Sequence, residues 1–258
     1  MIKIIDPVIF EIFSVEVRWY AFLIISAVVI SLLILEYLVK NDKKIEFEFF
    51  LDFLIFALPA AVLGARLYYV IFNIDYYLRY PQEILAVNQG GLAIHGAAGA
   101  SLIVLYIICQ RKNIGFLSAL DYISPVFVLG QSIGRWGNFI NQEAYGRIVS
   151  QNYYSFFPDI IKKQMYIDGY YREPTFLYES AANLFIFIFL IYYLKKKDFV
   201  SGDIFAIYLI LYSFFRYFIE ELRVDSLYLY NIQAAKLVSV MIIFGGVYIL
   251  YKNHYSSR

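Results

Sequence analysis

The residues best suited to chemistry lie in one short run from Gly134 to Arg147, with the sequence GRWGNFINQEAYGR. This run ends an apolar segment, and Arg135 and Arg147 enclose several amide and carboxylate side chains. Such groups are costly at the edge of a lipid bilayer, and by default they indicate a functional site there. Guanidinium forks bind phosphate and carboxylate groups well. The run therefore predicts a site for a charged ligand at a membrane boundary.

A second polar pattern occurs in a later apolar segment. Tyr212, Arg216 and Glu220 are spaced four residues apart, so on a helix they form one stripe. A structural Arg216–Glu220 ion pair would explain this stripe without a ligand. However, Arg66 and Arg135 are predicted at the same depth, and three arginines beside one carboxylate leave excess positive charge. That excess favours binding of an anion.

The run from Gly90 to Ala100 places His95 among small residues. Gly91, His95 and Gly99 are predicted to share a helix face, which would let a helix or a lipid approach the imidazole. Two interpretations stay open, a catalytic base and a hydrogen-bonded structural histidine. For Arg66, ligand contact and a bond that ties its helix to a carbonyl or glutamate are equally open.

The elements that must hold these residues are membrane helices. The chain has 258 residues, of which 61% are hydrophobic and 17% are charged, whereas a soluble domain is about half apolar and a quarter charged. A spanning helix needs about 20 mostly apolar residues. Seven segments qualify, namely 17–40, 47–72, 90–109, 116–133, 176–194, 203–222 and 232–251. We therefore expect an all-α integral membrane protein with about seven transmembrane helices.

Basic residues are concentrated in alternate connections and in the tail. They are Lys40, Lys43, Lys44, Arg111, Lys112, Lys195, Lys196, Lys197, Lys252 and Arg258. Because positively charged loops stay on the cytoplasmic side, we expect the N-terminus outside the membrane and the C-terminus in the cytoplasm. Residues 134–175 are then a long outer connection that is too rich in aromatic residues for disorder. We expect a small extracytoplasmic cap there, between helices in 1–133 and helices in 176–258.

Composition also excludes several classes of function. No basic patch or fold motif indicates nucleic-acid binding. Cys109 is the single cysteine, which excludes an internal disulfide and any multi-cysteine metal site. His95 and His254 are the only histidines, so a histidine-based metal centre is not expected.

Taken together, these residues resemble the prolipoprotein diacylglyceryl transferase family. The matching segments are Arg18–Tyr20, Gly64–Arg66, Gly91–Gly96, Gly134–Arg147, Pro174 with Leu177–Glu179, and Tyr212–Glu220. They follow the family's order over nearly the whole chain, and the run from Gly134 to Arg147 is the most specific. Two positions depart from the family's pattern. Ala97 stands where a second glycine usually follows the histidine, and Glu173 stands where a histidine is common.

The resemblance implies transfer of a diacylglyceryl group from phosphatidylglycerol to the lipobox cysteine thiol of a preprolipoprotein. Glycerol phosphate is released, no cofactor is used, and membrane lipids surround the enzyme in the bacterial cytoplasmic membrane. The residues that it marks as essential are Tyr20, His95, Arg135, Asn138, Gly146, Arg216 and Glu220, with Glu143 a further participant.

The chemistry of this reaction fits those residue types. The thiol must become a thiolate before it attacks carbon, and breaking the glycerol C–O bond increases the negative charge on the phosphate. We therefore expect Arg135 and Arg216 to clamp the phosphate and Asn138 to orient the headgroup. His95 is the candidate base, with arginine-assisted deprotonation as the open alternative. Glu143 and Glu220 are expected to hold the arginines. Further substrate-site candidates are Gly146, Tyr212 and Arg66, and Tyr20 is a further catalytic candidate.

Two other functions compete with this one. A transporter or channel for an anionic solute would also use intramembrane arginines, but it needs polar residues along the whole depth of a pathway. Here the predicted topology keeps them in the outer half. The second alternative is a different phospholipid headgroup transferase, which would use the same phosphate clamp.

Overall fold

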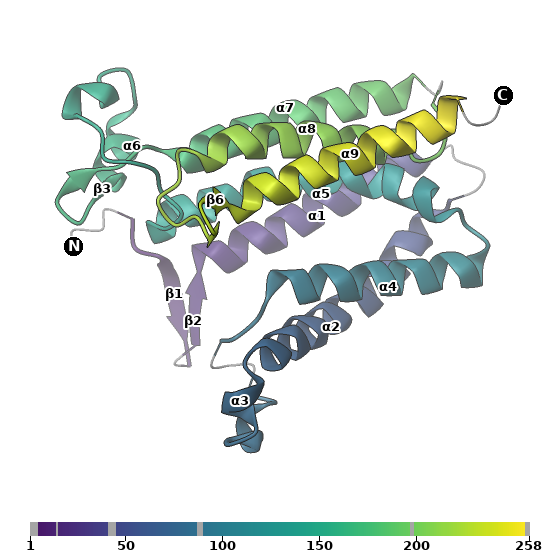
Figure 1. Cartoon of the computed structure of the whole chain (residues 1–258), viewed down its shortest axis with the longest axis horizontal. Helices are drawn as coiled ribbons and strands as arrows, with labels where there is room; N and C mark the ends of the chain where they lie inside the picture. Colours follow the sequence, from purple (N-terminus) through teal and green to yellow (C-terminus); the bar gives the residue numbers. More distant parts are fainter. Residues whose placement is uncertain (1–4, 14, 41–44, 87–89, 197–198, 256–258) are drawn as a thin grey trace. The chain divides into compact units, whose positions relative to one another are not determined.

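The computed structural model describes residues 5–13, 15–40, 45–86, 90–196 and 199–255. Long helices dominate these ranges (Figure 1). They are α1 (Trp19–Val39), α2 (Phe47–Phe72), α4 (Ile94–Lys112), α5 (Phe116–Asn141), α7 (Thr175–Lys195), α8 (Asp203–Glu220) and α9 (Ala234–Tyr255). Each corresponds to one of the seven predicted helices, which confirms the expected helical membrane fold. Lys43, Lys44, Lys197 and Arg258, which entered the topology prediction, lie outside the described residues.

Six of these helices in the described ranges are long and apolar enough to cross a membrane. The seventh, α8, is more polar because it contains Asp203, Arg216 and Glu220. All three side chains have ionic or hydrogen-bonding partners inside the protein. Pairing therefore compensates for the charges that set α8 apart from the other helices.

The chain divides into two compact units, residues 35–119 and residues 1–34 with 120–258. In the first of these, α2 and α4 pack backbone against backbone. A Cβ atom on Gly64 would lie 2.5 Å from Ala100 Cβ and 2.6 Å from Gly96 O, so only glycine fits at position 64. The short helices α3 (Ile74–Tyr77) and η1 (Pro81–Glu83) follow α2.

In the larger unit, hydrogen bonds between helices fix α5 against α7 and α8. Ser132 Oγ, in the second half of α5, donates to Ser180 O, near the start of α7, at 2.8 Å. At the other end of α5, the buried Asp121 carboxylate accepts the N–H groups of Gly202 at 2.6 Å and Phe205 at 2.9 Å. This carboxylate satisfies N–H groups that the first turn of α8 would otherwise leave unpaired. The register of α8 along α5 is thereby set.

Two predicted helix ends were wrong. α5 ends at Asn141 rather than at 133, so Arg135 and Asn138 lie in its last turns and not beyond it. Their side chains have partners in the protein, so the helix continues past the end of the apolar pattern. α4 begins at Ile94 rather than at 90, because Gly90 and Gly91 take φ values of +88° and +69°. Gly91 therefore does not share a helix face with His95.

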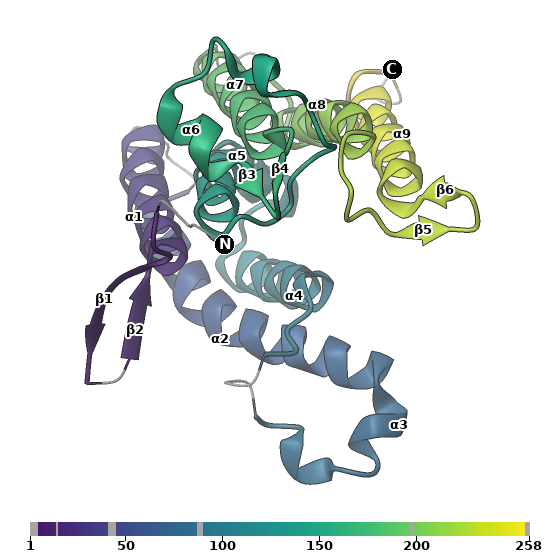
Figure 2. The same cartoon turned by 90° about the vertical axis from the view of Figure 1, so that its left-hand side faces the viewer.

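The segment between α5 and α7 is folded. It contains η3 (Gln151–Tyr154), α6 (Asp159–Gln164) and a hairpin of β3 (Tyr166–Ile167) and β4 (Tyr170–Tyr171) (Figure 2). A buried cluster joins these elements to the adjoining ends of α5 and α7. Its members are Phe139, Ile140, Tyr154, Ile161, Met165, Ile167 and Phe176.

Two further hairpins occur at helix starts. β1 (Val8–Ile12) and β2 (Val15–Arg18) lead directly into α1, and β5 (Tyr228–Leu229) and β6 (Ile232–Gln233) lead directly into α9. In the part of the chain that the structure describes, each of these sheets has two strands.

Candidate functional site

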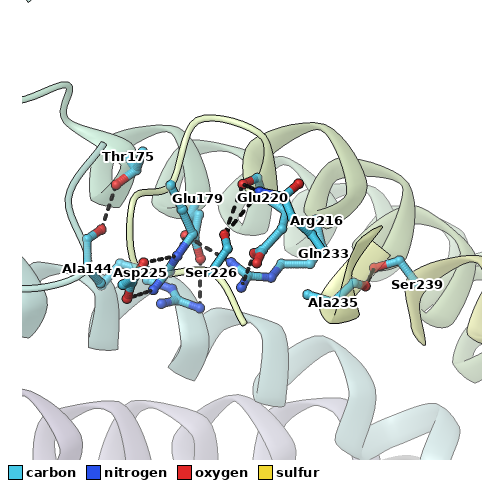
Figure 3. A network of polar contacts seen from close by, with 12 residues as sticks. Ala144, Thr175, Glu179, Arg216, Glu220, Asp225, Ser226, Gln233, Ala235 and Ser239 are labelled. Carbon is cyan, nitrogen blue, oxygen red and sulfur yellow. Dashed lines mark hydrogen bonds and ion pairs between the residues drawn. The ribbon is translucent and has the colours of Figure 1, made fainter. Parts of the chain in front are cut away.

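The centre of the candidate site is a carboxylate shared by three arginines. Glu179, on α7, is 5% exposed and lies 2.7 Å from Arg135 Nη2, 3.2 Å from Arg216 Nη1 and 2.9 Å from Arg223 Nη1. Arg135 comes from α5, Arg216 from α8, and Arg223 from the loop after α8. Figure 3 shows Glu179 facing Arg216 across the two helices. The site therefore joins three helices through one buried charge.

Two further carboxylates complete this ionic cluster. Arg216 Nη2 lies 2.5 Å from Glu220 Oε2, one helical turn along α8. Arg223 donates from Nε and Nη2 to the two oxygens of Asp225, at 2.9 and 2.6 Å. Three arginines thus face three carboxylates among the described residues. The prediction placed Arg66, Arg135 and Arg216 beside one carboxylate. In this cluster Arg135 and Arg216 have two carboxylate partners, Glu179 and Glu220, so these two arginines do not leave the predicted excess of positive charge.

The three arginines are not equally open to a ligand. Arg135 and Arg216 side chains are 22% and 20% exposed, whereas Arg223 is 11% exposed and held by carboxylates on both sides. A guanidinium has five N–H donors, and the contact of Arg135 with Glu179 uses its Nη2 end. Arg135 and Arg216, the two arginines predicted to clamp an anion, are thus the better placed to receive one. Arg223 braces Glu179.

Charge pairing also affects the loop after α8. Burial acts to raise the pKa of Asp225, but the hydrogen bond and charge of Arg223 outweigh it and lower that pKa overall. For Arg223, burial acts to lower the pKa, and bonding to Asp225 with the charge of Glu179 raises it overall. Both groups are therefore charged at neutral pH.

The end of α5 is closed by Glu143. Its carboxylate accepts hydrogen bonds from Asn138 Nδ2 at 3.2 Å and Asn141 Nδ2 at 3.0 Å, and its N–H donates to Asn138 O at 3.0 Å. The prediction that Glu143 holds an arginine is not met in the described contacts. There Glu143 holds asparagines, and Glu179 holds the arginines.

The backbone beyond α5 takes an unusual path. Gln142 and Ala144 have φ values of +58° and +55°, a region that residues other than glycine rarely occupy. Thr175 Oγ1 donates to Ala144 O at 2.6 Å, and Gln142 Nε2 donates to Gln164 O at 2.7 Å. These bonds hold the strained turn in place and orient the chain beyond it.

Gly146 lies just after this turn and is tightly enclosed. Its N–H donates to Glu173 O at 2.9 Å, and it forms an isolated bridge with Arg223. A Cβ atom at this position would lie 2.8 Å from Glu173 Cβ and 3.0 Å from Thr175 Cγ2. The small size of Gly146 therefore lets the run from Gly134 to Arg147 contact the loop that carries Arg223. Burial raises the pKa of Glu173, and the charge of Arg147 opposes that shift.

Tyr20 and Tyr212 lie on helices of the same unit. Tyr20, in the first turn of α1, contacts α5 so closely that a Cβ atom on Gly137 would collide with its ring. Tyr212 is half-buried on α8, one turn before Arg216, and its ring centroid lies 5.7 Å from that of Tyr208. The larger unit thus contains both predicted arginines together with Asn138, Glu143 and Glu220.

Arg66 has a structural environment in the smaller unit. It is buried on α2, and its guanidinium donates to the carbonyl oxygens of Glu83, Ile84, Gly90 and Gly91 at 2.6 to 3.2 Å. Of the two interpretations left open, the bond to carbonyls is confirmed. Arg66 thereby ties α2 to the connection into α4.

His95 lies in the first turn of α4 and is exposed. Its ring centroid lies 6.0 Å from that of Tyr68 on α2. The close approach of α2 is made by Gly96, beside it, since a Cβ atom there would lie 2.5 Å from Tyr68 Cβ. Gly99, expected to give access to the imidazole, has open space around its Cα.

Two residues of the site were missed by sequence reasoning. Glu179 was noted only within the family resemblance, and Arg223 was not among the predicted candidates. A lone carboxylate in a spanning segment is the same signal that marked the arginines, and it would have singled out Glu179. As for metals, no cluster of three or more His, Cys, Asp or Glu residues suited to one occurs within the described ranges.

Comparison with known proteins identifies the family. A model of the prolipoprotein diacylglyceryl transferase family matches residues 7–252. A phosphatidylglycerol–prolipoprotein diacylglyceryl transferase of Clostridium novyi (strain NT) is 44% identical over 253 residues, covering 98% of each chain. Enzymes of the same name from Finegoldia magna and Streptococcus uberis are each 43% identical, covering 94% of this chain and 93% of their own. The chain therefore belongs to the prolipoprotein diacylglyceryl transferase family.

Proposed function

We propose that this chain transfers the diacylglyceryl group of phosphatidylglycerol to the lipobox cysteine thiol of a preprolipoprotein. The observation that carries this proposal is that Arg135 and Arg216 both pair with Glu179 while their side chains stay 22% and 20% exposed. The relatives' names supply the same two substrates. The site geometry supports a phosphate-bearing ligand independently of those names.

The reaction balances without a cofactor. The thiol loses its proton, and the thiolate attacks the glycerol carbon that bears the phosphate. A C–S bond forms and a C–O bond breaks, with the electron pair of the broken bond remaining on the phosphate oxygen. Glycerol phosphate leaves as a phosphomonoester. Because negative charge grows on the phosphate in the transition state, positioned donors accelerate this step.

Each site residue receives a role from its surroundings. Arg135 and Arg216 hold the phosphate, and Glu179, Glu220 and Arg223 fix their orientation. Asn138, held by Glu143, contacts the glycerol headgroup. Gly146 and Tyr212 remain candidates for the substrate site, and Tyr20 remains a catalytic candidate. His95 takes the thiol proton, with an arginine-assisted route as the alternative.

The apolar helices make this a multi-pass membrane protein. We further propose that it lies in the bacterial cytoplasmic membrane with the N-terminus and residues 142–174 outside. Lys40, Arg111 and Lys112 support this orientation, since they lie at or near helix ends predicted to be cytoplasmic.

Topology is tested with a single cysteine at the exposed Ser150. In a Cys109→Ser background, a Ser150→Cys variant should react with an impermeant thiol reagent in intact spheroplasts, because residue 150 lies in the cap. A cysteine at Lys112, at the opposite end of α4 from His95, is the matched control and should react only after lysis. The reverse pattern would overturn the orientation and the outer position of the site.

The role of His95 is tested by His95→Asn. Asparagine keeps a polar contact but cannot take the proton, so transfer should collapse while the fold and lipid binding persist. Raising the pH toward the reference thiol pKa of about 8.5 should recover part of the rate, because more of the acceptor cysteine is then ionised. Rates and phosphatidylglycerol binding are measured across this pH range.

The matched control is His254→Asn, which changes the other histidine, at the far end of α9 beside Asp203. This variant should keep the wild-type pH profile. If His95→Asn instead binds phosphatidylglycerol weakly and gains nothing at high pH, His95 orients the lipid or braces α4 and is not the base.

The reaction itself is tested by mass spectrometry of lipids and peptides. The reconstituted chain is incubated with phosphatidylglycerol and a lipobox peptide, and the expected products are a peptide heavier by one diacylglyceryl group and free glycerol phosphate. An anion transporter would leave both substrates unchanged. Another headgroup transferase would yield a new lipid and leave the peptide unmodified.

A further inference from the structure

Two hairpins of the larger unit expose aromatic side chains almost completely at their turns. Phe13, between β1 and β2, is 98% exposed, and Tyr230, between β5 and β6, is 95% exposed. Both residues have positive φ values, +48° and +54°. Exposure of a large aromatic side chain to water is unfavourable, because the ring could instead bury its apolar area against another apolar surface.

The β5–β6 hairpin is uncharged and mostly apolar. Leu227, Tyr228, Leu229 and Ile232 are all exposed, and no charged residue occurs between Asp225 and Lys236 in the sequence. A two-stranded hairpin of this kind is marginally stable by itself in water. The exposed apolar side chains of this hairpin indicate that at least one of its faces is covered by something other than bulk water.

The β1–β2 hairpin separates apolar from acidic side chains. Phe10 pairs with Val17 across the strands, whereas the next pair is Glu11 with Glu16. Because successive residues of a strand point to opposite faces, the exposed Phe10 and Ile12 share one face and the glutamates occupy the other. Glu16 is neutralised in part by Arg18, whose Nη2 lies 2.6 Å away.

Each hairpin is joined directly to a long apolar helix, and this connection indicates what covers the apolar side chains of the hairpins. β2 ends at Arg18 and α1 begins at Trp19, while β6 ends at Gln233 and α9 begins at Ala234. α1 and α9 both have the length and composition of membrane spans. The two hairpins lie at the same end of the larger unit in Figure 1. Each apolar hairpin therefore continues the surface of a helix that lipid surrounds.

We propose that both hairpins lie in the lipid–water interface of one leaflet, with Phe13, Tyr230 and the apolar faces inserted among the lipids. Aromatic side chains are favoured at this depth. The acidic face of β1–β2 then points to water, away from anionic headgroups. This placement does not depend on the reaction that the site performs.

The β5–β6 hairpin is also bonded to the ionic cluster. Gln233 Nε2 donates to Glu220 O at 3.0 Å and to Ser226 Oγ at 3.2 Å. Glu220 is the carboxylate paired with Arg216. A hairpin seated at headgroup depth thus holds the end of α8, and with it Arg216, at the level where lipid phosphates lie.

Spin labels test this placement. In the full-length Cys109→Ser chain, Phe13→Cys, Tyr230→Cys and Glu11→Cys variants are labelled with a nitroxide. They are reconstituted into vesicles of phosphatidylglycerol and phosphatidylethanolamine. Positions 13 and 230 should collide several-fold less with a water-soluble nickel complex than position 11, and more with oxygen. Glu11, on the acidic face of the same hairpin, is the matched control.

Equal access of the nickel complex to all three positions would overturn the proposal. So would strong immobilisation with little access to either reagent, which would indicate a protein partner, and so would spin–spin broadening, which would indicate a second copy. Retained transfer activity identifies folded variants. If Tyr230→Cys fails to fold, Leu229→Cys in the same hairpin makes the same measurement.

Discussion

Replacing Glu179 by alanine is expected to lower the free energy of unfolding by about 3–5 kcal/mol, the range for breaking a buried ion pair by removing one partner. Glu179 is shared by Arg135, Arg216 and Arg223, so its loss leaves three neighbouring guanidinium groups with two carboxylates. Transfer should be lost as well, because the arginines would separate. Unfolding in mixed detergent micelles, followed by tryptophan fluorescence, measures the stability change.

Glu221→Ala is the matched control for this change. The Glu221 side chain is 65% exposed and lies 3.5 Å from Lys236, which is 19% exposed. Because Glu221 is well solvated, its loss should cost about 1 kcal/mol or less. If the two variants had the same free energy of unfolding, the proposed role of Glu179 in holding the three arginines together would be wrong.

Arg135→Lys is expected to reduce the transfer rate by a factor of about 10² to 10³, nearly as much as Arg135→Ala. That range is typical for loss of one donor aimed at transition-state charge. Lysine keeps the positive charge but lacks the planar fork that can hold Glu179 and a phosphate at once. Rates are measured with phosphatidylglycerol and a lipobox peptide at saturating and at low lipid concentrations.

Arg147→Lys, in the same run from Gly134 to Arg147, is the matched control. Its side chain is 60% exposed and lies 3.9 Å from Glu173, so the shape of the cationic group matters little there. Near-normal transfer by folded Arg135→Lys protein would reduce Arg135 to a source of bulk positive charge.

The number and order of the long helices could be predicted from the sequence because hydropathy alone identifies segments of spanning length. Their ends could not. α5 continues through Arg135 and Asn138 because Glu179 and Glu143 satisfy those side chains. Glu179 is distant in sequence and Glu143 lies in the following loop. The hydropathy pattern therefore does not predict that α5 extends to Asn141.

The candidate site was predicted in part. Arg135, Arg216 and Glu220 do lie together, since helical spacing and charge both marked them. Glu179 was overlooked because it interrupts an apolar helix only once. The two interpretations of Arg66 stayed open because the sequence does not indicate where backbone carbonyl groups gather. Carbonyl groups between α2 and α4 accept hydrogen bonds from the Arg66 guanidinium.

The completely buried Cys109 has a consequence for an enzyme that handles thiols. It is the only cysteine of the chain, and it lies near the end of α4 opposite to His95. Burial raises the barrier to any reaction of its sulfur with an electrophile. The protein therefore presents no thiol of its own to a reactive lipid, and self-modification does not compete with the incoming cysteine.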